Sequence, residues 1–363
     1  MQVRRVHVSR YTVPLPRVAE DATHGSISCF SLITVRARTR DGVEGVGYTY
    51  TVGRTGGAAI ASVIADDLVP VVLNRDSRRI EQIWRSMHQA THYLGHGGPT
   101  SFAISAMDIA LWDIKAKAVR EPLWRLLGAA DPNVQAYAGG IDLNLPIDEL
   151  EAQTRASLKQ GFRAIKMKVG RPRLREDVER VLAMRHWIGP DAPLMVDANM
   201  KWTVEEAIKA SHAFAEHDVY WLEEPTAPWD VPGHVRIQRE GALPVAAGEN
   251  LRTLPEFEGM ISAGGVAFPE PDVSNCGGIT GWMKVARLAE ARNLPVTSHG
   301  VHDLHVSLLA AVPNASFLEV HGFGLDTYLR MPLTIRAGCA TPPEAPGHGV
   351  QFRWNLLREH LEN

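Results

Sequence analysis

Residues 164–170 (AIKMKVG), 194–199 (LMVDAN), 220–225 (YWLEEP) and 244–250 (PVAAGEN) are short, largely apolar runs that each carry a charged side chain near the end. The pattern continues at 269–275 (PEPDVSN), 295–300 (PVTSHG) and 316–320 (SFLEV). Successive end residues lie 20 to 29 positions apart: Lys168, Asp197, Glu223, Glu249, Asp272, His299 and Glu319. A strand–helix unit of a parallel barrel takes about 25 to 30 residues. The spacing therefore predicts an α/β barrel whose polar side chains converge at the carboxyl ends of the strands.

Three regions can be separated along the 363 residues, which exceed the size of one ordinary hydrophobic core. Residues 1–125 begin with alternating strand patterns and a turn signal at Asp41-Gly42, then change to helical spacing, which predicts an α+β capping domain. Residues 126–330 alternate short strands with helices and form the expected barrel. Residues 331–363 are rich in Pro and Gly and end in a short polar helix, and we expect them to return to the capping domain.

Composition excludes several classes of function. Hydrophobic residues make up 45% of the chain and charged residues 22%, and the net charge of −3 gives no footprint for nucleic acid or an anionic membrane. The partner is therefore expected to be a small molecule. The three cysteines (Cys29, Cys276 and Cys339) form no CxxC pair. The N-terminal residues alternate like a strand and lack the apolar core of a signal peptide, so a cytoplasmic protein is expected. No apolar run reaches membrane-spanning length.

A metal site is predicted by three carboxylates at strand ends. Asp197, Glu223 and Glu249 are spaced 26 residues apart twice over, and hard oxygen ligands without a nearby cysteine favour Mg²⁺, or alternatively Mn²⁺, over zinc. The alternative is three unrelated acids that cap helices. Adjacent strand residues face opposite ways, so the even spacing favours Glu223 as ligand and gives the neighbouring Glu224 a supporting role.

Two lysines are predicted to point into the barrel. Lys166 and Lys168 are two positions apart on one strand, so their ammonium groups share a face of the sheet. Their mutual repulsion and a nearby Mg²⁺ should depress the pKa of either lysine toward neutrality and make it a base. The alternative is that the strand ends early and both side chains reach solvent.

A second acid/base group is predicted on the last strands. Asp272 and His299 lie on consecutive runs, so the carboxylate can hold one imidazole nitrogen and leave the other for proton transfer. Three further histidines (His302, His305 and His321) lie near, and a structural hydrogen-bonding role is the default for each of them.

The sequence closely resembles the enolase superfamily, and within it the mandelate racemase/muconate lactonizing enzyme subgroup, over essentially the whole chain. The resemblance rests on 103–117 (AISAMDIALWDIKAK), 161–170 (GFRAIKMKVG), VDAN, WLEEP, AAGEN, 271–282 (PDVSNCGGITGW) and SHG. It implies a modified (β/α)₇β barrel with an N-terminal α+β cap that the C-terminal tail completes, and an active site between the two. Acid-sugar dehydratases such as galactarate/talarate dehydratase belong to this subgroup, and a homo-oligomer is expected.

The resemblance also implies roles for the polar residues. One Mg²⁺ per subunit would be held by Asp197, Glu223 and Glu249. Lys168 would be one base, and His299, supported by Asp272, the opposite one. The substrate carboxylate would be neutralised by Lys166 and hydrogen-bonded by Glu319, and Asn199 would touch the substrate.

Two outcomes follow from removal of a proton next to a carboxylate. A substrate with a β-hydroxyl can lose water and give a 2-keto-3-deoxy acid, whereas one without it can only be racemised or epimerised. Dehydration of a hexonate or hexarate, in carbohydrate catabolism, is the first expectation and racemisation of a 2-hydroxy acid the alternative. A catalytically silent binding protein is disfavoured, because every ligand and base is present.

Substrate specificity is expected to come from two cap loops, residues 17–30 and 48–57. Arg17, His24 and Arg54 in these segments are polar enough to meet sugar hydroxyls or a distal carboxylate. The alternative for each is a solvated loop side chain.

Overall fold

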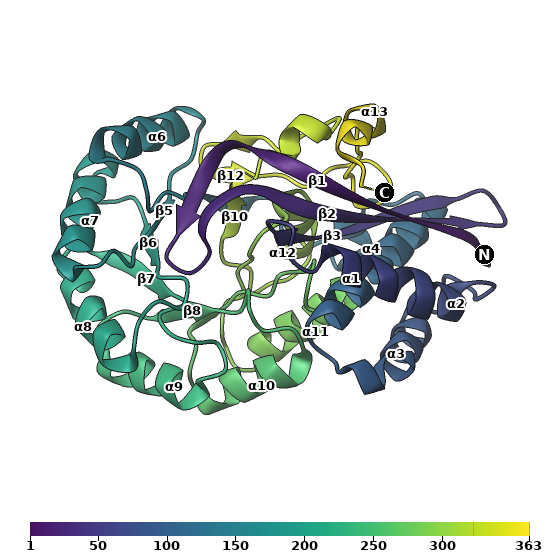
Figure 1. The fold of residues 1–363 in the computed structure, drawn as a ribbon, viewed down its shortest axis with the longest axis horizontal. Helices are drawn as coiled ribbons and strands as arrows, with labels where there is room; N and C mark the ends of the chain where they lie inside the picture. Colours follow the sequence, from purple (N-terminus) through teal and green to yellow (C-terminus); the bar gives the residue numbers. More distant parts are fainter. Residues whose placement is uncertain (322, 363) are drawn as a thin grey trace.

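The structure is a computed structural model that describes residues 1–321 and 323–362. Figure 1 shows a ring of strands surrounded by helices, with a long N-terminal hairpin reaching across the ring and a group of helices beside it. The expected barrel with an α+β cap is therefore confirmed.

Seven parallel strands build the barrel. Strands β4 to β9 pair in chain order, and β10 closes the ring by pairing with β4. Their bounds are β4 Val134–Gly139, β5 Ile165–Lys168, β6 Leu194–Asp197, β7 Val219–Glu223, β8 Val245–Ala247, β9 Phe268–Pro269 and β10 Leu318–His321. The outer helices are α6 Ile147–Lys159, α7 Leu174–Ile188, α8 Val204–Ala215, α9 Val231–Glu240, α10 Leu254–Ala263, α11 Gly278–Glu290 and α12 His302–Leu309.

The run 295–300 does not form the regular strand that its sequence predicts. Val296 makes only an isolated bridge with Ala315, and the Thr297 amide donates to the Pro269 carbonyl at 3.0 Å. Pro269 and Pro295 lack the amide hydrogen that a continuous ladder needs, so pairing is interrupted here. The segment still occupies the place between β9 and β10 and carries His299 to the end of the barrel.

The cap begins with a three-stranded antiparallel sheet of β1 (Val3–Asp21), β2 (Gly25–Thr39) and β3 (Glu44–Val52). The predicted turn at Asp41-Gly42 joins β2 to β3. The expectation of a loop at 17–30 is wrong, because pairing resumes after a register shift between Pro14 and Ala19 and continues to Asp21 and Gly25. Only residues 22–24 remain as the tip of a long hairpin.

Helices complete the cap beside this sheet. They are α1 Gly57–Ser62, η1 Val63–Leu68, α2 Val69–Val72, α3 Ile80–Ala90, η2 His92–Leu94, α4 Pro99–Val119 and α5 Leu123–Leu127. Pro99 starts α4, where a missing amide hydrogen costs nothing, and most of the helix is buried. Strand β3 lies so close to α4 that a Cβ at Gly47 would be 1.9 Å from the Ala106 carbonyl oxygen.

Polar side chains of α4 fasten the cap to the barrel. The Ser105 hydroxyl accepts from the Gly277 and Gly278 amides at 2.9 Å, and Asp108 accepts from the Thr280 amide and hydroxyl at 2.9 and 2.7 Å. Burial raises the pKa of Asp108 to about 7, although both bonds from Thr280 oppose the shift. These contacts fix the loop between β9 and α11, which also carries Asp272.

Gly47→Ala is expected to lower the free energy of unfolding by about 3 kcal/mol, because the added methyl group overlaps a backbone carbonyl that cannot move. Denaturant unfolding followed by circular dichroism measures the change. The matched control is Gly259→Ala in α10, where a Cβ meets nothing within 4 Å and the change should stay within about 1 kcal/mol. Equal stability of the two variants would contradict the close contact of β3 with α4.

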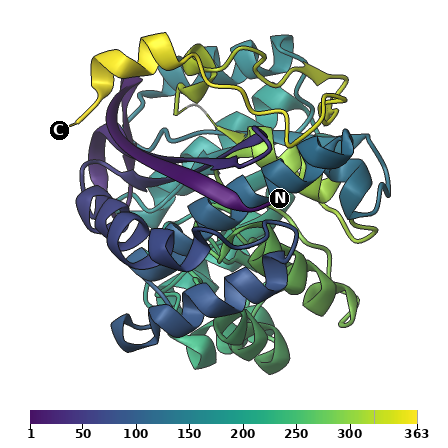
Figure 2. The same cartoon turned by 90° about the vertical axis from the view of Figure 1, so that its right-hand side faces the viewer.

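The C-terminal segment contacts both parts of the molecule. Strands β11 (Ile335–Arg336) and β12 (Cys339–Ala340) join the barrel sheet beside β4, whereas α13 (Trp354–Leu357) and η4 (Arg358–His360) lie near β1. Figure 2 shows this last helical stretch, in yellow, next to the N-terminal hairpin. Arg10 pairs with Glu362 at 2.8 Å and Tyr11 bridges to Leu361. Boundaries at residues 125 and 330 stay a prediction.

Within the described residues, no helix is both long and apolar enough to cross a membrane.

Candidate active site

Three carboxylates converge at the carboxyl ends of neighbouring strands. Asp197 ends β6, Glu223 ends β7, and Glu249 lies two residues after β8. One oxygen from each falls within 4.8 Å of the others, and all three side chains are buried. Oxygen atoms this close together can bind one divalent cation.

The electrostatics of this cluster favour a cation. Burial raises the pKa of Glu223 to about 8 against the opposing effect of Lys166, and the nearby Asp197 and Glu319 add to the shift. Glu249 Oε2 is buried and accepts no well-aligned hydrogen bond, although His299 Nε2 lies 3.1 Å away. Three buried hard oxygen donors match the preference of Mg²⁺.

Lys166 and Lys168 both point into the barrel and are buried. The Lys166 ammonium contacts Glu223 and lies 2.6 Å from Glu319 and 3.6 Å from Asp197, while the Lys168 ammonium contacts Asp197. Each ammonium group thus neutralises carboxylates of the cluster. The catalytic role of each lysine stays a prediction.

The sequence predicts a depressed pKa for Lys166 or Lys168, but the contacts in this structure raise the pKa of both. Burial lowers the pKa of Lys168, but the attraction of Asp197, Glu249 and Glu223 outweighs it, so the pKa lies above its usual value. The pKa of Lys166 is raised for the same reason. A divalent cation on the same carboxylates would cancel this attraction, so a neutral lysine depends on the bound cation.

His299 and Asp272 form the expected pair. His299 Nδ1 lies 3.1 Å from Asp272 Oδ2, and Nε2 lies 3.1 Å from Glu249 Oε2. Burial lowers the pKa of His299, but Glu249 and Asp272 raise it more, to about 10. Tyr50, on cap strand β3, donates its hydroxyl to the same Asp272 oxygen at 3.3 Å. The cap therefore helps to orient this acid/base pair.

Glu319 on β10 accepts from the Gly300 amide at 3.0 Å and pairs with Lys166. Burial would raise its pKa, but Lys166 and two nearby histidines hold it well below the usual range. Glu319 is therefore ionised and fixes both Lys166 and the backbone next to His299.

The backbone is strained next to two of the carboxylates. Asn199 and Glu224 adopt φ angles of +43° and +39°, a region that side chains other than glycine rarely occupy. The turn leaves Asn199 Oδ1 buried without a hydrogen-bond partner. Glu224, also buried, accepts from Asn250 Nδ2 at 2.7 Å and lies outside the carboxylate cluster.

A pocket of about 430 Å³ opens between the cap and the barrel above these groups. Its floor includes Glu249, Asn275 and His299. The opposite wall comes from the cap and is largely apolar: Val52, Ile60, Pro99 and Phe102. Its polar lining residues are His24, Tyr50, Thr51, Thr55, Asn250 and Arg252. The pocket size suits a small ligand.

The three cap residues expected at the substrate have different positions. His24 lines the pocket. Arg17 is half exposed and turns to Gln153, at 3.1 Å, and Glu149, at 3.7 Å. Arg54 lines another depression with Arg10 and Glu362. Of the three, the structure brings only His24 together with His299 and Glu249.

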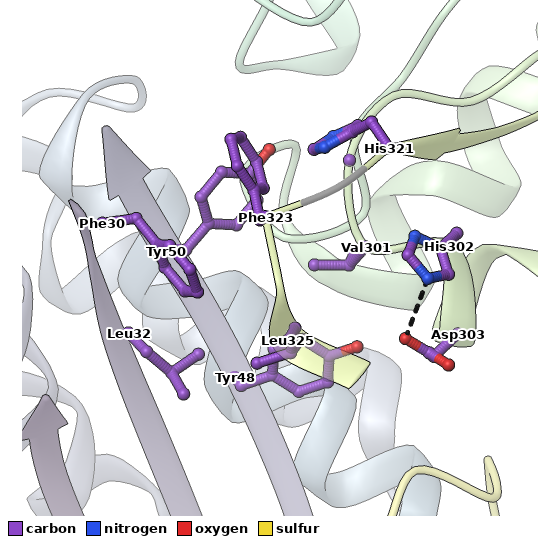
Figure 3. A pocket seen from close by; sticks show the side chains of 11 residues that line it. Phe30, Leu32, Tyr48, Tyr50, Val301, His302, Asp303, His321, Phe323 and Leu325 are labelled. Atoms are coloured by element: carbon purple, nitrogen blue, oxygen red, sulfur yellow. Dashed lines mark ion pairs between the residues drawn. The ribbon is translucent and has the colours of Figure 1, made fainter. Parts of the chain in front are cut away.

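A second cavity, of about 20 Å³, is also lined by Tyr50 (Figure 3). It has room for about one water molecule. His302 faces it and pairs with Asp303 at 3.4 Å and Asp326 at 3.3 Å, whereas both ring nitrogens of His321 lack a hydrogen-bond partner. Tyr50 thus lines both this small cavity and the larger pocket.

Sequence reasoning missed two lining residues. Tyr50 lies within the segment 48–57 expected to contact substrate, but nothing in the sequence pairs it with Asp272. Arg252 donates to the Glu249 carbonyl and to Asn250 Oδ1, the latter at 3.0 Å, and covers the Phe102 ring at 4.9 Å. Arg252 lies three residues after Glu249, a predicted metal ligand, and this proximity is the sequence signal from which it could have been found.

A carboxylate cluster at the mouth of a barrel, two lysines and an Asp–His pair define a metal-dependent acid/base enzyme. Residues 4–128 match the family model of the mandelate racemase/muconate lactonizing enzyme N-terminal domain, and residues 149–356 match that of the enolase C-terminal domain-like family. The chain belongs to the mandelate racemase/muconate lactonizing enzyme family of the enolase superfamily, which confirms the resemblance.

Similar proteins catalyse related reactions. A 3,6-anhydro-alpha-L-galactonate cycloisomerase from Streptomyces coelicolor is 53% identical over 355 residues, 98% of each chain. A structure of a racemase from Streptomyces coelicolor A3(2) with bound magnesium has a TM-score of 0.97 and 51% identity, covering 99% of this chain and 100% of that one.

L-talarate/galactarate dehydratase from Salmonella typhimurium LT2, liganded with Mg and L-lyxarohydroxamate, has a TM-score of 0.95 and 31% identity, covering 100% of this chain and 93% of that one. The expectation of a lyase or isomerase is confirmed by these relatives, and their magnesium agrees with the cofactor expected from the carboxylate cluster.

Proposed function

We propose that the protein is a Mg²⁺-dependent cycloisomerase that opens the ring of a 3,6-anhydrohexonate to give a 2-keto-3-deoxy acid. Asp197, Glu223 and Glu249 would hold the metal, which the close approach of their buried oxygens favours. When bound, Mg²⁺ supplies positive charge beside the substrate carboxylate and stabilises the negative charge that develops there.

The remaining groups provide the proton transfers. Lys166, held by Glu319, neutralises the substrate carboxylate, and Asn199 offers its unpaired oxygen to a substrate hydroxyl. Lys168 comes from β5 and His299 from the segment 295–300, and they contact different carboxylates of the cluster, so one removes the proton from C2 of the substrate. Departure of the oxygen on C3 then leaves an enol, which tautomerises to the keto acid.

The apolar residues of the cap wall support this choice of substrate. A five-membered ether ring offers carbon atoms to Val52, Ile60, Pro99 and Phe102. An extended hexarate would place hydroxyls and a second carboxylate against this wall, and burying polar groups without partners costs roughly 1–3 kcal/mol each. The sequence favoured a hexonate or hexarate because the family that it resembles contains acid-sugar dehydratases, and it placed Arg17, His24 and Arg54 at the substrate.

Ring opening and dehydration differ only in the leaving group. In both, the C2–H and C3–O bonds break and the carbonyl forms at C2. In the anhydro acid the departing oxygen stays attached through C6, so the product is an isomer and no water is released. The 53% identical cycloisomerase supports this reading, and dehydration of an open hexonate is the second candidate because of the Salmonella dehydratase.

Keto acid formation from 3,6-anhydro-L-galactonate tests the proposal. A semicarbazide assay is run with this substrate beside L-galactonate, galactarate and talarate, and polarimetry is run on mandelate and lactate. We expect keto acid from the anhydro acid at a kcat/KM at least about 100-fold above that of any open-chain acid. A preference for an open-chain acid would favour dehydration, and racemisation of a simple hydroxy acid alone would overturn both readings.

A further inference from the structure

The tip of the N-terminal hairpin is anchored over the carboxyl ends of the barrel strands, as Figure 1 shows. The Thr23 hydroxyl donates to the Asn199 carbonyl, and the Leu143 amide donates to the Glu20 carbonyl at 3.0 Å. Ala22 packs on Gly170, where an added Cβ would lie 2.8 Å from the alanine methyl. These contacts hold the tip in one place above the end of β5 and the loop after β6.

The tip carries a second Asp–His pair. His24 Nδ1 lies 2.8 Å from Asp21 Oδ2, and Asp21 Oδ1 accepts from the Thr23 and His24 amides at 2.9 and 2.6 Å. Asp21 is buried, whereas His24 is 36% exposed and lines the pocket together with Glu249 and His299. Because Asp21 occupies Nδ1, His24 presents Nε2 to its surroundings.

Asp21 favours the protonated form of His24, which can donate a proton. The hydrogen bond that His24 Nδ1 makes to Asp21 raises the pKa of His24, although burial opposes the shift. Lys168 and His299 belong to the barrel and to the chemistry at C2, and neither comes from the cap. His24 lines the same pocket from the cap side, across from Glu249 and His299, so it is placed to serve a substrate atom beyond C2.

We infer that His24, positioned by Asp21, is the acid that protonates the oxygen leaving C3. This inference rests on the proposed function. The base takes the C2 proton, the C3–O electron pair goes to the oxygen, and His24 Nε2 gives that oxygen its proton. The enol then takes a proton at C3 and becomes the 2-keto-3-deoxy acid, and the partly exposed His24 regains its proton from water.

His24→Asn separates the two steps. In D₂O with 3,6-anhydro-L-galactonate, we expect keto acid formation to fall at least about 100-fold, the usual contribution of a general acid. Deuterium should still enter C2 of the recovered substrate, at a rate within about tenfold of wild-type turnover, because Lys168 and His299 are intact. NMR of the recovered substrate and the product measures both rates, and the exposed His92→Asn is the matched control.

Each other outcome counts against the inference. Unchanged keto acid formation in His24→Asn would show that another group protonates the leaving oxygen. Parallel loss of exchange and product would show that His24 only shapes the pocket. If wild-type protein forms no keto acid from this substrate or from any acid sugar, the proposed function itself has failed, which is distinct from a failure of His24→Asn alone.

Discussion

Glu249→Gln is expected to weaken Mg²⁺ binding by at least about 100-fold and to reduce turnover at least as much. The change removes a negative charge from the cluster of Asp197, Glu223 and Glu249 and puts an amide in place of a buried carboxylate. The fold should persist, because glutamine has nearly the same shape and the side-chain contacts affected are those with His299 at 3.1 Å and Asn250 at 3.4 Å. Isothermal titration with Mg²⁺ gives the affinity, and circular dichroism checks the fold.

Glu224→Gln is the matched control for this change. Glu224 is equally buried and adjacent to a ligand, but it points to Asn250, and a glutamine oxygen can accept the same hydrogen bond. Mg²⁺ affinity should therefore change far less than in Glu249→Gln. Full activity of Glu249→Gln, or of wild-type protein in excess EDTA, would contradict the metal assignment.

His299→Asn is expected to abolish net product, with a loss of about 1,000-fold or more, yet to leave exchange of the C2 proton on one substrate epimer. Lys168 and His299 reach the cluster from different strands, β5 and the segment after Val296, so each base should serve its own face of the substrate. Asparagine retains a hydrogen-bonding side chain of similar shape but cannot take a proton.

Lys168→Ala should lose exchange on the epimer that His299→Asn still exchanges, and should retain exchange on the other epimer. Deuterium exchange into each C2 epimer, followed by NMR in both variants, distinguishes the two faces. If the two variants lost exchange on both epimers equally, Lys168 and His299 would not be independent bases, and the account of the proton transfers would need one base only.

The polar residues at the strand ends could be predicted because a barrel imposes one spacing on all of them. Asp197, Glu223 and Glu249 are adjacent in space for that reason alone. The 295–300 segment was less predictable, since Pro295 and the neighbouring Pro269 of β9 remove ladder hydrogen bonds while the barrel still holds the chain in place. The sequence pattern therefore predicted the position of His299 but not the irregular backbone of the segment that carries it.

The cap contacts could not be predicted from local sequence. The long hairpin, with its tip at 22–24, depends on pairing that resumes after a register shift, and this pairing brings His24 to the pocket while Arg54 faces elsewhere. The pKa of Lys166 depends on Glu319, a carboxylate that lies 153 positions away in the chain. Such distant neighbours leave no trace in a local pattern.

The most direct test of the central claim is the fate of 3,6-anhydro-L-galactonate incubated with the Mg²⁺-loaded protein in D₂O. Removal of the C2 proton followed by C3–O cleavage predicts a 2-keto-3-deoxy acid isomeric with the substrate, with deuterium at C3 and no oxygen lost, and none of it after EDTA. NMR and mass spectrometry of the product decide the matter. Substrate recovered with deuterium at C2 and inverted configuration, without any keto acid, would contradict the account.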